Sequence, residues 1–300
     1  MKRFKMAIVI LLLIFLLMLC ITARIYEKNF EFRGVVTEQE TAELFGQYPK
    51  LRREKETIIT KGNIELIGYW YNKKANQPII VFSQGIRTKA VGYINEINFF
   101  ATNGYSVFSF DNTGCGESGG DNIRGLPQSV VDLDCVLSYL ENKDEYKNTK
   151  IFLYGHSWGG YAVCAVNMFN HRVSGIAERS GFNDTVKMIK RTITDRQNKV
   201  VANVIGPFVK IYEFMKFGKY ANATAVAGIN LANCPVMIMH SYDDTVVPFD
   251  VGIASCKDVI TNPSVTFKLY DDKNHHITDK DGVYDYKILE EIKNFFDELK

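Results

Sequence analysis

The segment KIFLYGHSWGGYAVCAVNMF, residues 150–169, decides the fold, because it reads as a strand that turns directly into a helix. Its first part is a short apolar run typical of a buried parallel strand, and the residues from Ser157 onward favour a helix. The turn has the pattern Gly-x-Ser-x-Gly, and it can hold a serine hydroxyl at the carboxyl edge of a sheet. The pattern alone is a weak signal. Ser157 is therefore either a nucleophile or an ordinary turn serine until its context is considered.

The rest of the chain alternates between the same two kinds of segment. Helical patterns near 93–102, at 126–142 and at the C-terminus separate apolar runs that predict strands. This alternation predicts an α/β fold with a mostly parallel sheet and helices on both faces. The predicted strands are Ile64–Tyr71, Pro78–Ser83, Tyr105–Asp111, Lys150–Gly155, Val173–Ser180, Pro235–His240 and Val265–Tyr270.

One segment, from about residue 183 to 230, interrupts this alternation. It contains helical patterns such as VKMIKRTITDRQNKVV but no good strand. A helical insertion at this point of a parallel sheet would form a cap over the strand ends, where open α/β sheets bind their ligands.

Two later strands lead into the residues that a serine nucleophile needs. A serine requires a base and an orienting acid, and in a strand–turn–helix architecture these follow in the order Ser, Asp or Glu, His. Asp243 and Asp244 come just after one strand, and His275 and His276 come just after the last. Order and placement agree for all three roles, which is far more specific than the five-residue pattern.

At this point the chain from about residue 58 to its end resembles the α/β-hydrolase superfamily, in particular its serine aminopeptidase-like and esterase-like branches with a small helical cap. The blocks VFSQGIR, FDNTGCGESGG, YGHSWGG and MIMHSYDDTVVP, followed by KNHH, carry the resemblance. It implies Ser157 as nucleophile, Asp244 as the acid beside the Val-Pro pair and His275 as the base. Asp243 and His276 stay open as alternatives.

The resemblance is incomplete at three positions. Gln84 stands where the family often has His, Thr113 where Arg is common, and Asn274 where Gly precedes the catalytic His. The oxyanion hole that the resemblance implies uses the backbone N–H groups of Trp158 and Ile86, so the change at position 84 does not remove it. The implied chemistry needs no metal and no organic cofactor.

The N-terminus differs in kind from the rest. MKRFK precedes an uncharged run from Met6 to Ala23, which as a helix spans about 27 Å, close to the thickness of a bilayer. The run is long for a signal peptide, and ITA is a poor cleavage site, so an uncleaved anchor is favoured. Lys and Arg are nearly balanced on its two sides, and the short basic tail places the catalytic body outside. We expect an anchor over 1–24, a stalk or packing arm over 25–55 and a catalytic domain over 56–300.

Composition excludes several classes of function. The net charge of +2 gives no reason to expect a nucleic-acid partner, and the spacing of the six cysteines matches no zinc pattern. The sequence therefore predicts a membrane-anchored serine hydrolase that cleaves a carboxylic ester or thioester of an acyl or lipid-like substrate. A peptidase of the same fold is the alternative within enzymes, with Glu178 as a candidate for binding a free amine. A non-catalytic binding protein is the alternative outside them, and the sequence leaves oligomeric state open.

Overall fold

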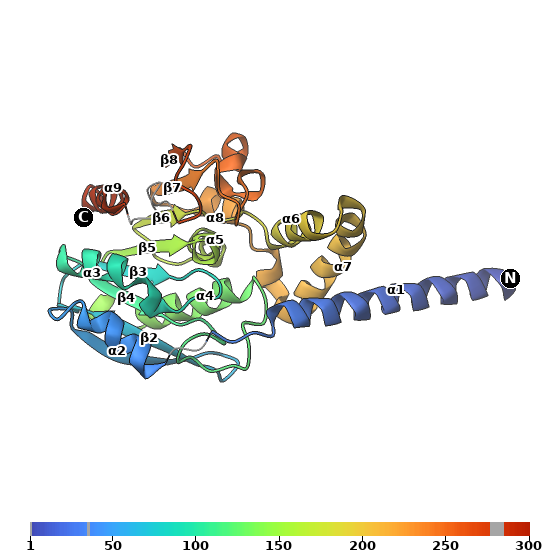
Figure 1. Cartoon of the computed structure of the whole chain (residues 1–300), viewed down its shortest axis with the longest axis horizontal. Coiled ribbons are helices and arrows are strands. Elements are labelled where there is room, and N and C mark those ends of the chain that lie inside the picture. The colour runs from blue at the N-terminus through green and yellow to red at the C-terminus, as the bar shows by residue number, and fades with distance from the viewer. Residues whose placement is uncertain (1, 35–36, 277–284) are drawn as a thin grey trace.

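The computed structural model describes residues 2–34, 37–276 and 285–300, and a single eight-stranded sheet runs through the body (Figure 1). The strand order is β1-β2-β4-β3-β5-β6-β7-β8. The β1–β2 and β2–β4 pairs are antiparallel, and the remaining pairs are parallel. The predicted mostly parallel α/β sheet is thus confirmed. The strands are β1 Arg53–Ile59, β2 Glu65–Tyr71, β3 Ile79–Ser83, β4 Ser106–Phe110, β5 Ile151–His156, β6 Gly175–Arg179, β7 Val236–Ser241 and β8 Val265–Tyr270.

Alternate side chains of the central strands enter two apolar cores, one on each face of the sheet. In β3, Ile79 and Val81 join the core under α4, α5 and α8, whereas Ile80 and Phe82 join the core under α3 and α9. A strand covered on both faces is apolar throughout, which is why this apolar run is easy to recognise in the sequence. The helices are α1 Lys2–Phe30, α2 Glu38–Gly46, α3 Ile94–Thr102, α4 Gln128–Glu141, α5 Trp158–Ala165, α6 Thr185–Arg196, α7 Lys199–Phe217, α8 Ala225–Leu231 and α9 Tyr286–Asp297.

The edge strand β1 was not among the predicted strands. Its sequence REKETII is mostly charged or polar, and Ile58 is its one buried residue. It pairs with β2 in a register that runs from Arg53 opposite Tyr71 to Ile59 opposite Glu65. Charged side chains on an edge strand discourage pairing with other chains, and they also weaken the apolar pattern from which strands are predicted.

The N-terminal run forms the helix α1, which projects from the body (Figure 1). Its most apolar window has a mean hydropathy of 3.2 and is almost entirely exposed, so in length and composition α1 can cross a bilayer. The helix continues to Phe30 without a break. Thr22, Tyr26 and Phe30, four residues apart on one helical face, are buried against the body. The end of α1 is therefore part of the folded domain.

The helices α6 and α7 lie between β6 and β7 in the chain and form a hairpin beside α1 (Figure 1). Each begins at a side-chain cap: Asp184 accepts a hydrogen bond from the Lys187 N–H, and Asn198 accepts one from the Val201 N–H. Two separate caps define two helices, because each satisfies backbone donors that the preceding turn leaves open. The hairpin occupies the segment for which the sequence predicts a cap.

Candidate active site

Ser157 lies on the turn between β5 and α5 in a conformation that non-glycine residues rarely adopt. Its backbone angles are φ 58° and ψ −114°, and its N–H donates to the Arg179 carbonyl at 2.8 Å. Glycines make the turn possible: a Cβ at Gly159 would lie 2.0 Å from the Ser83 oxygen, and one at Gly155 would lie 2.3 Å from the Gly159 oxygen. Strain of this kind, of order 1–3 kcal/mol, persists only where the surroundings impose it.

The structure brings Asp244 and His275 into direct contact. Asp244 Oδ2 lies 2.7 Å from His275 Nδ1, and Asp244 Oδ1 accepts the N–H groups of Val246 and Val247 at 2.9 and 2.8 Å. Both side chains are buried. Because the carboxylate holds Nδ1, the opposite nitrogen of the ring, Nε2, is left to act as a base.

His275 is also fixed through its backbone, next to the turn that carries Ser157. Its carbonyl accepts a hydrogen bond from Ser180 Oγ at 2.8 Å and lies 3.1 Å from His156 Nε2. The rings of His156 and His275 are 4.8 Å apart. The candidate base therefore packs against the residue that immediately precedes the candidate nucleophile.

The two alternative residues lie differently. Asp243 Oδ1 accepts from Ser241 Oγ at 2.6 Å and from the Asn274 N–H at 2.8 Å, so it ties the loop after β7 to the loop that carries His275. The ring of His276 lies 5.1 Å from that of His156, and burial lowers its pKa. Asn274 has φ 48°, in the left-handed region. Glycine and then asparagine tolerate this region best, which explains the departure from the family's glycine.

The loop after β3 lies against the turn that carries Ser157. A Cβ built on Gly85 would lie 3.6 Å from Ser157 Cβ, so the backbone at Gly85 and Ile86 borders the candidate nucleophile. Gln84 Nε2 donates to the Thr88 carbonyl at 3.2 Å, and Thr88 Oγ1 donates to the Gly85 carbonyl at 3.0 Å. The side chain of Gln84 thus stabilises the conformation of the loop. The sequence analysis considered only the backbone at this position and did not predict that role.

Trp158 is the first residue of α5, so its backbone N–H has no partner within the helix. Its indole ring is fully buried, and Nε1 donates to the Leu126 carbonyl at 2.7 Å. The ring therefore fixes the start of α5, whose first backbone N–H adjoins Ser157.

A buried chain of hydrogen bonds that the sequence analysis missed links this loop to His275. The Gly85 N–H donates to the Tyr93 hydroxyl at 3.0 Å, and that hydroxyl lies 2.8 Å from His156 Nδ1. Burial, together with the nearby Arg179, lowers the pKa of His156 well below its usual value, so its ring is neutral. Because the His275 carbonyl can only accept, Nε2 carries the one ring proton and donates to it, and Nδ1 accepts from the Tyr93 hydroxyl. His156 stands inside the Gly-x-Ser-x-Gly pattern, which was the one signal available.

The loop after β4 acts as a scaffold. Asp111 accepts the N–H groups of Ala90 and Glu117 at 2.9 and 3.0 Å, and burial raises its pKa. Thr113 Oγ1 donates to Asp132 at 2.8 Å, and burial raises the pKa of Asp132 to about 6. Thr113 therefore anchors the loop to α4 at the position where the family commonly has arginine.

Glu178, the candidate for binding an amine, lies in the interior. It is fully buried, its Oε2 accepts the Gly181 N–H at 2.8 Å, and burial raises its pKa well above the usual value. A Cβ at Gly160 would come within 3.0 Å of the same oxygen, so the side chain sits behind α5. A group in this position supports the turn and is not presented to a substrate.

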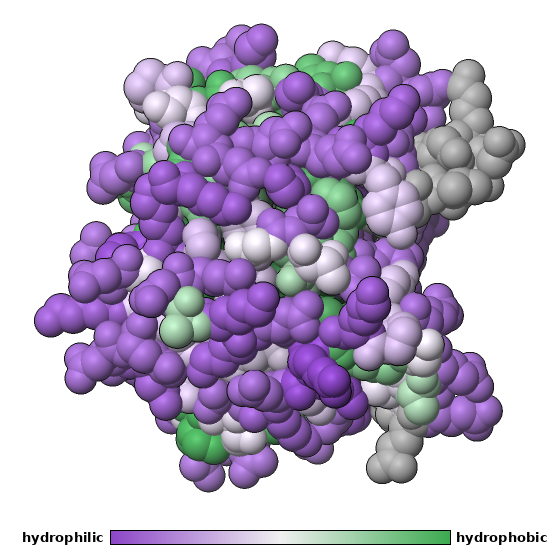
Figure 2. All heavy atoms as spheres, turned by 90° about the vertical axis from the view of Figure 1, so that its left-hand side faces the viewer, coloured by the Kyte–Doolittle hydropathy of each residue, from purple (hydrophilic) through white to green (hydrophobic). Residues whose placement is uncertain are grey.

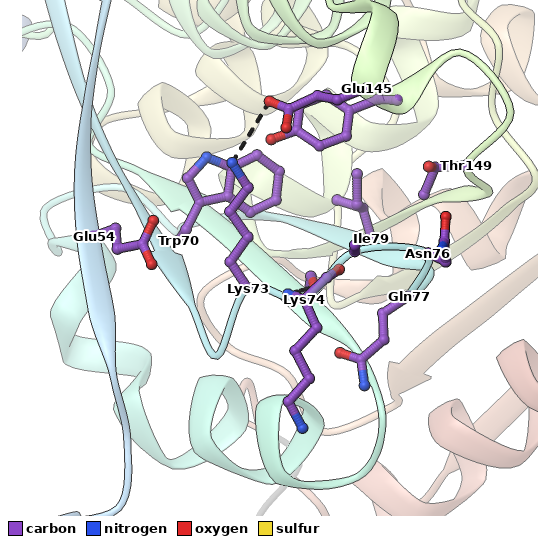
Figure 3. A pocket seen from close by; sticks show the side chains of 12 residues that line it. Glu54, Trp70, Lys73, Lys74, Asn76, Gln77, Ile79, Glu145 and Thr149 are labelled. Atoms are coloured by element: carbon purple, nitrogen blue, oxygen red, sulfur yellow. Dashed lines mark hydrogen bonds and ion pairs between the residues drawn. The ribbon is translucent and has the colours of Figure 1, made fainter.

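A pocket of about 390 Å³ lies at the opposite edge of the sheet (Figure 3). Its lining includes Ile79 and Ser106, the first residues of β3 and β4, whereas Ser157 follows the last residue of β5. Lys73 crosses it, 3.5 Å from Glu145 and 5.0 Å from the centre of the Trp70 ring. This pocket is separate from the candidate site. In the described part of the chain, no group of three or more His, Cys, Asp or Glu is arranged to hold a metal ion.

Known proteins resemble the chain in sequence over part of its length. The model of a family described as serine aminopeptidase, S33, matches residues 74–178. Lysophosphatidylserine lipase ABHD12 of Danio rerio is 25% identical over 198 residues, which cover 61% of this chain and 48% of the lipase. The chain thus spans about half the length of the lipases that it matches.

The structural likeness is broader. An esterase of Pyrococcus furiosus superposes with a TM-score of 0.64 at 18% identity, covering 88% of this chain and 94% of the esterase. Est1E from Butyrivibrio proteoclasticus, solved with ferulic acid, gives 0.62 at 18% identity over 81% of this chain and 98% of Est1E. The acylaminoacyl peptidase of Pyrococcus horikoshii gives 0.61 at 15% identity, covering 86% of this chain and 43% of the peptidase. The chain therefore has the fold of the α/β-hydrolases.

Within this fold, the block matched by the family model runs from just before β3 to within one residue of the end of β6. It therefore includes the loop with Ile86 and the turn with Ser157 and Trp158. Asp244 and His275 lie beyond it, on the loops after β7 and β8. Their place in the site rests on the contacts described above.

Proposed function

We propose that this α/β-hydrolase is a serine hydrolase that cleaves a carboxylic ester through Ser157, His275 and Asp244. The observation that carries the proposal is the 2.7 Å contact between Asp244 Oδ2 and His275 Nδ1, beside a serine held at φ 58° on the turn after β5. A serine in this setting has the base and the orienting acid that activation requires.

The proposed reaction begins when His275 Nε2 takes the proton of Ser157 Oγ as that oxygen attacks the ester carbonyl. Asp244 keeps the proton of the imidazole on Nδ1 and stabilises the imidazolium that forms. The two backbone N–H groups at Val246 and Val247 keep the carboxylate itself in place. His275 then protonates the leaving alkoxide, and water releases the acyl group from Ser157 by the same steps in reverse order.

The developing oxyanion is proposed to accept hydrogen bonds from the N–H groups of Trp158 and Ile86. The indole of Trp158 and the side chains of Gln84 and Thr88 hold these two backbone segments rigid. Removing one such donor typically costs about 10²–10³ in rate, so the rigidity of both segments matters for catalysis.

An acyl or lipid-like ester is the substrate class that the comparisons favour. Matched relatives carry the name lysophosphatidylserine lipase, and one of the structural neighbours is an esterase of Pyrococcus furiosus. A lysophospholipid has a single acyl ester and resides in membranes, which suits a hydrolase with an apolar N-terminal helix. Thioesters share the acyl chemistry and belong to the same proposal.

A peptidase is the second candidate, because the matched family is described as serine aminopeptidase and one neighbour is an acylaminoacyl peptidase. The burial of Glu178 removes the residue considered for binding a free amine. A panel of p-nitrophenyl esters of increasing acyl length, tested beside aminoacyl arylamides, separates the two. Turnover of the arylamides alone would contradict the ester proposal.

The central experiment is labelling of the full chain in membranes with a fluorophosphonate probe that traps activated serines. We expect strong labelling of the wild type and of Ser255→Ala, whose hydroxyl bonds only near its own 3₁₀ turn, and none of Ser157→Ala. His275→Ala and Asp244→Ala should label at least about 100-fold more slowly. Equal labelling of Ser157→Ala and the wild type would overturn the assignment of the nucleophile.

We further propose that α1 anchors the enzyme, with residues 1–24 as the anchor, 56–300 as the catalytic domain and a cap insertion at about 183–230. The catalytic body is placed on the extracytoplasmic side. Reporter proteins fused after Lys300 test this placement. Alkaline phosphatase is active only when it folds outside the cytoplasm, whereas green fluorescent protein fluoresces only when it stays in the cytoplasm. Fluorescence without phosphatase activity would reverse the orientation.

A further inference from the structure

One face of α7 carries an apolar stripe with nothing packed on it in the described part of the chain. Val200, Val204, Phe214 and Met215 are 72%, 50%, 56% and 67% exposed, although α7 is a long, well-formed helix. Soluble surfaces carry single exposed apolar residues, but a stripe repeated at helical spacing marks a contact surface. The stripe consists of Val200, Val204, Pro207, Ile211, Phe214 and Met215.

The stripe adjoins the helix that is apolar enough to cross a membrane. The rings of Phe208 and Phe15 are 5.4 Å apart, and those of Tyr212 and Tyr26 are 5.3 Å apart. Phe15 lies in the middle of the apolar run of α1, so α7 reaches the level of that run (Figure 1). If α1 crosses a bilayer, α7 extends from the level of the headgroups, at its contact with Tyr26, into the level of the acyl chains, at its contact with Phe15.

Polar contacts between side chains fix α7 to α1 and to α6. The Tyr26 hydroxyl donates to Glu213 Oε1 at 2.9 Å, and Thr185 Oγ1 donates to Glu213 Oε2 at 2.7 Å. Glu27 pairs with Lys216 at 2.5 Å and accepts a hydrogen bond from Tyr212. These contacts hold the hairpin at one height along α1.

The charge of the hairpin is strongly positive. Residues 185–217 contain seven Lys and Arg but only two acidic residues, although the whole chain carries a net charge of only +2. One of the acidic residues, Glu213, is buried, and the other, Asp195, is paired with Arg191. The opposite end of the molecule, seen in Figure 2, is covered mainly by polar side chains. The basic and apolar features of the hairpin lie together beside α1.

We propose that the outer face of α7 lies in the interface of a bilayer that contains anionic lipid, with its apolar stripe in the acyl boundary and the basic residues of the hairpin at the headgroups. An amphipathic helix with a basic polar face binds membranes in this way. The enzyme then contacts the bilayer twice, through α1 and through the cap. This inference requires α1 to span the membrane but does not depend on Ser157, His275 or Asp244.

Tryptophan fluorescence in the full chain tests the proposal directly. Both native tryptophans, Trp70 and Trp158, are fully buried, so a tryptophan placed on the surface reports its own surroundings. We would introduce Val204→Trp or Phe214→Trp and reconstitute each variant in vesicles with lipids brominated near the headgroup end of the acyl chains. The matched control is Leu231→Trp, which is equally exposed in the wild type but lies at the end of α8, near the amino end of β7.

We expect the bromolipid to quench the Val204→Trp and Phe214→Trp signals at least about threefold more than the Leu231→Trp signal. Equal quenching of the three variants would overturn the proposal. Quenching at position 204 that appears only when the protein is diluted in lipid would also overturn it, because it would mean that a second copy of the chain covers this position. Quenching at 204 should fall at least about twofold in purely zwitterionic vesicles and in the variant Lys187→Gln/Arg196→Gln/Lys199→Gln. Insensitivity to both changes would overturn the role of anionic lipid. None of these readouts uses catalysis, so failure here is distinct from failure of the fluorophosphonate test.

Discussion

At the scale of single residues, the hydrogen-bonded chain from Gly85 through Tyr93 and His156 to the His275 carbonyl joins the two halves of the candidate site. One end borders the proposed oxyanion donor, and the other holds the proposed base. Every member is buried, so each hydrogen bond is costly to lose. The sequence could not reveal this chain, because Tyr93 is far from His156 in sequence and resembles any other core aromatic.

Removing the Tyr93 hydroxyl should therefore impair catalysis more than substrate binding. In Tyr93→Phe, the Gly85 N–H and His156 Nδ1 lose their partner, which should lower the free energy of unfolding by about 1–3 kcal/mol. We expect kcat for a p-nitrophenyl ester to fall roughly tenfold, the equivalent of about 1.4 kcal/mol, with little change in KM. Steady-state kinetics and denaturant unfolding measure the two effects.

The control is Tyr105→Phe, which removes a hydroxyl that bonds Asp297 at 2.7 Å, in the core under α9. It should lose stability while kcat stays unchanged. If Tyr93→Phe lost stability to the same degree but kept its kcat, the chain of hydrogen bonds would be structural only.

The departures from the family pattern show what sequence reasoning can and cannot reach. Asn274 and Gln84 could be flagged as unusual, but their explanations need the fold: the first residue adopts φ 48°, and the second bonds the Thr88 carbonyl across a loop. In contrast, the sequence places Ser157, the pair Asp243–Asp244 and the pair His275–His276 after three strands, and parallel strands end at one edge of a sheet. The choice of Asp244 and His275 within those pairs came from the resemblance.

At the scale of elements, the turn between β5 and α5 depends on the close approach of α5 to β3. A methyl group at Gly159 would lie 2.0 Å from the Ser83 carbonyl oxygen, so Gly159→Ala must push the helix off the strand. We expect a loss of roughly 3 kcal/mol or more in unfolding free energy and no fluorophosphonate labelling. Thermal unfolding and labelling measure both.

Gly92→Ala is the matched control for this change. Its added methyl group would meet nothing closer than 3.9 Å, so stability and labelling should stay near the wild type. A folded, fully labelled Gly159→Ala would show that the helix can shift without cost, contrary to our account of the turn.

Buried strands were predictable and the edge strand was not, for one physical reason. β3 is apolar at every position because helices cover both its faces, whereas β1 meets water and buries Ile58 alone. The apolar pattern used to predict a strand reflects which of its residues are buried. Similarly, the apolar run of α1 was evident, but its continuation to Phe30 depends on tertiary contacts of Tyr26 and Phe30.

The contact between α1 and α7 predicts a pH dependence of stability. Burial raises the pKa of Glu213 from 4.5 to about 7, while Thr185, Tyr26 and Lys210 act in the opposite direction. Folding therefore takes up a proton between about pH 4.5 and 7. The stability that this provides is complete below pH 4.5 and is lost as the pH rises to about 7, by up to roughly 3 kcal/mol.

Glu213→Gln should lack this dependence, because its amide is neutral at every pH. We expect its stability relative to the wild type to rise from pH 4.5 to 7 and then to level off, measured by thermal unfolding in detergent. Glu290→Gln, which alters an exposed side chain of α9, should run parallel to the wild type throughout. A Glu213→Gln curve that also runs parallel would contradict the buried, protonated state of this carboxyl group.

At the scale of the whole molecule, α1 combines a run that is apolar enough to cross a membrane with an end that is part of the folded body. Its exposed portion touches the body at few points, whereas Tyr26 and Phe30 belong to the main core. Just beyond the helix, Arg33 donates to the Ser118 carbonyl at 2.7 Å, and Gly34 bridges to Cys115, which ties the segment to the loop after β4. Two deletions should therefore behave very differently.

A chain that lacks residues 2–21 keeps these contacts, and we expect it to be folded and labelled by fluorophosphonate, with a melting temperature within a few degrees of the full chain. A chain that lacks residues 2–30 loses two buried aromatic residues and leaves Glu213 without its Tyr26 partner. Loss of a buried aromatic side chain costs about 3–5 kcal/mol, so this second protein should be largely unfolded or aggregated. Thermal unfolding and labelling of both chains decide the matter. Equal stability of the two would mean that α1 is only a tether. The contacts between α1 and the cap would then contribute nothing to the free energy of unfolding.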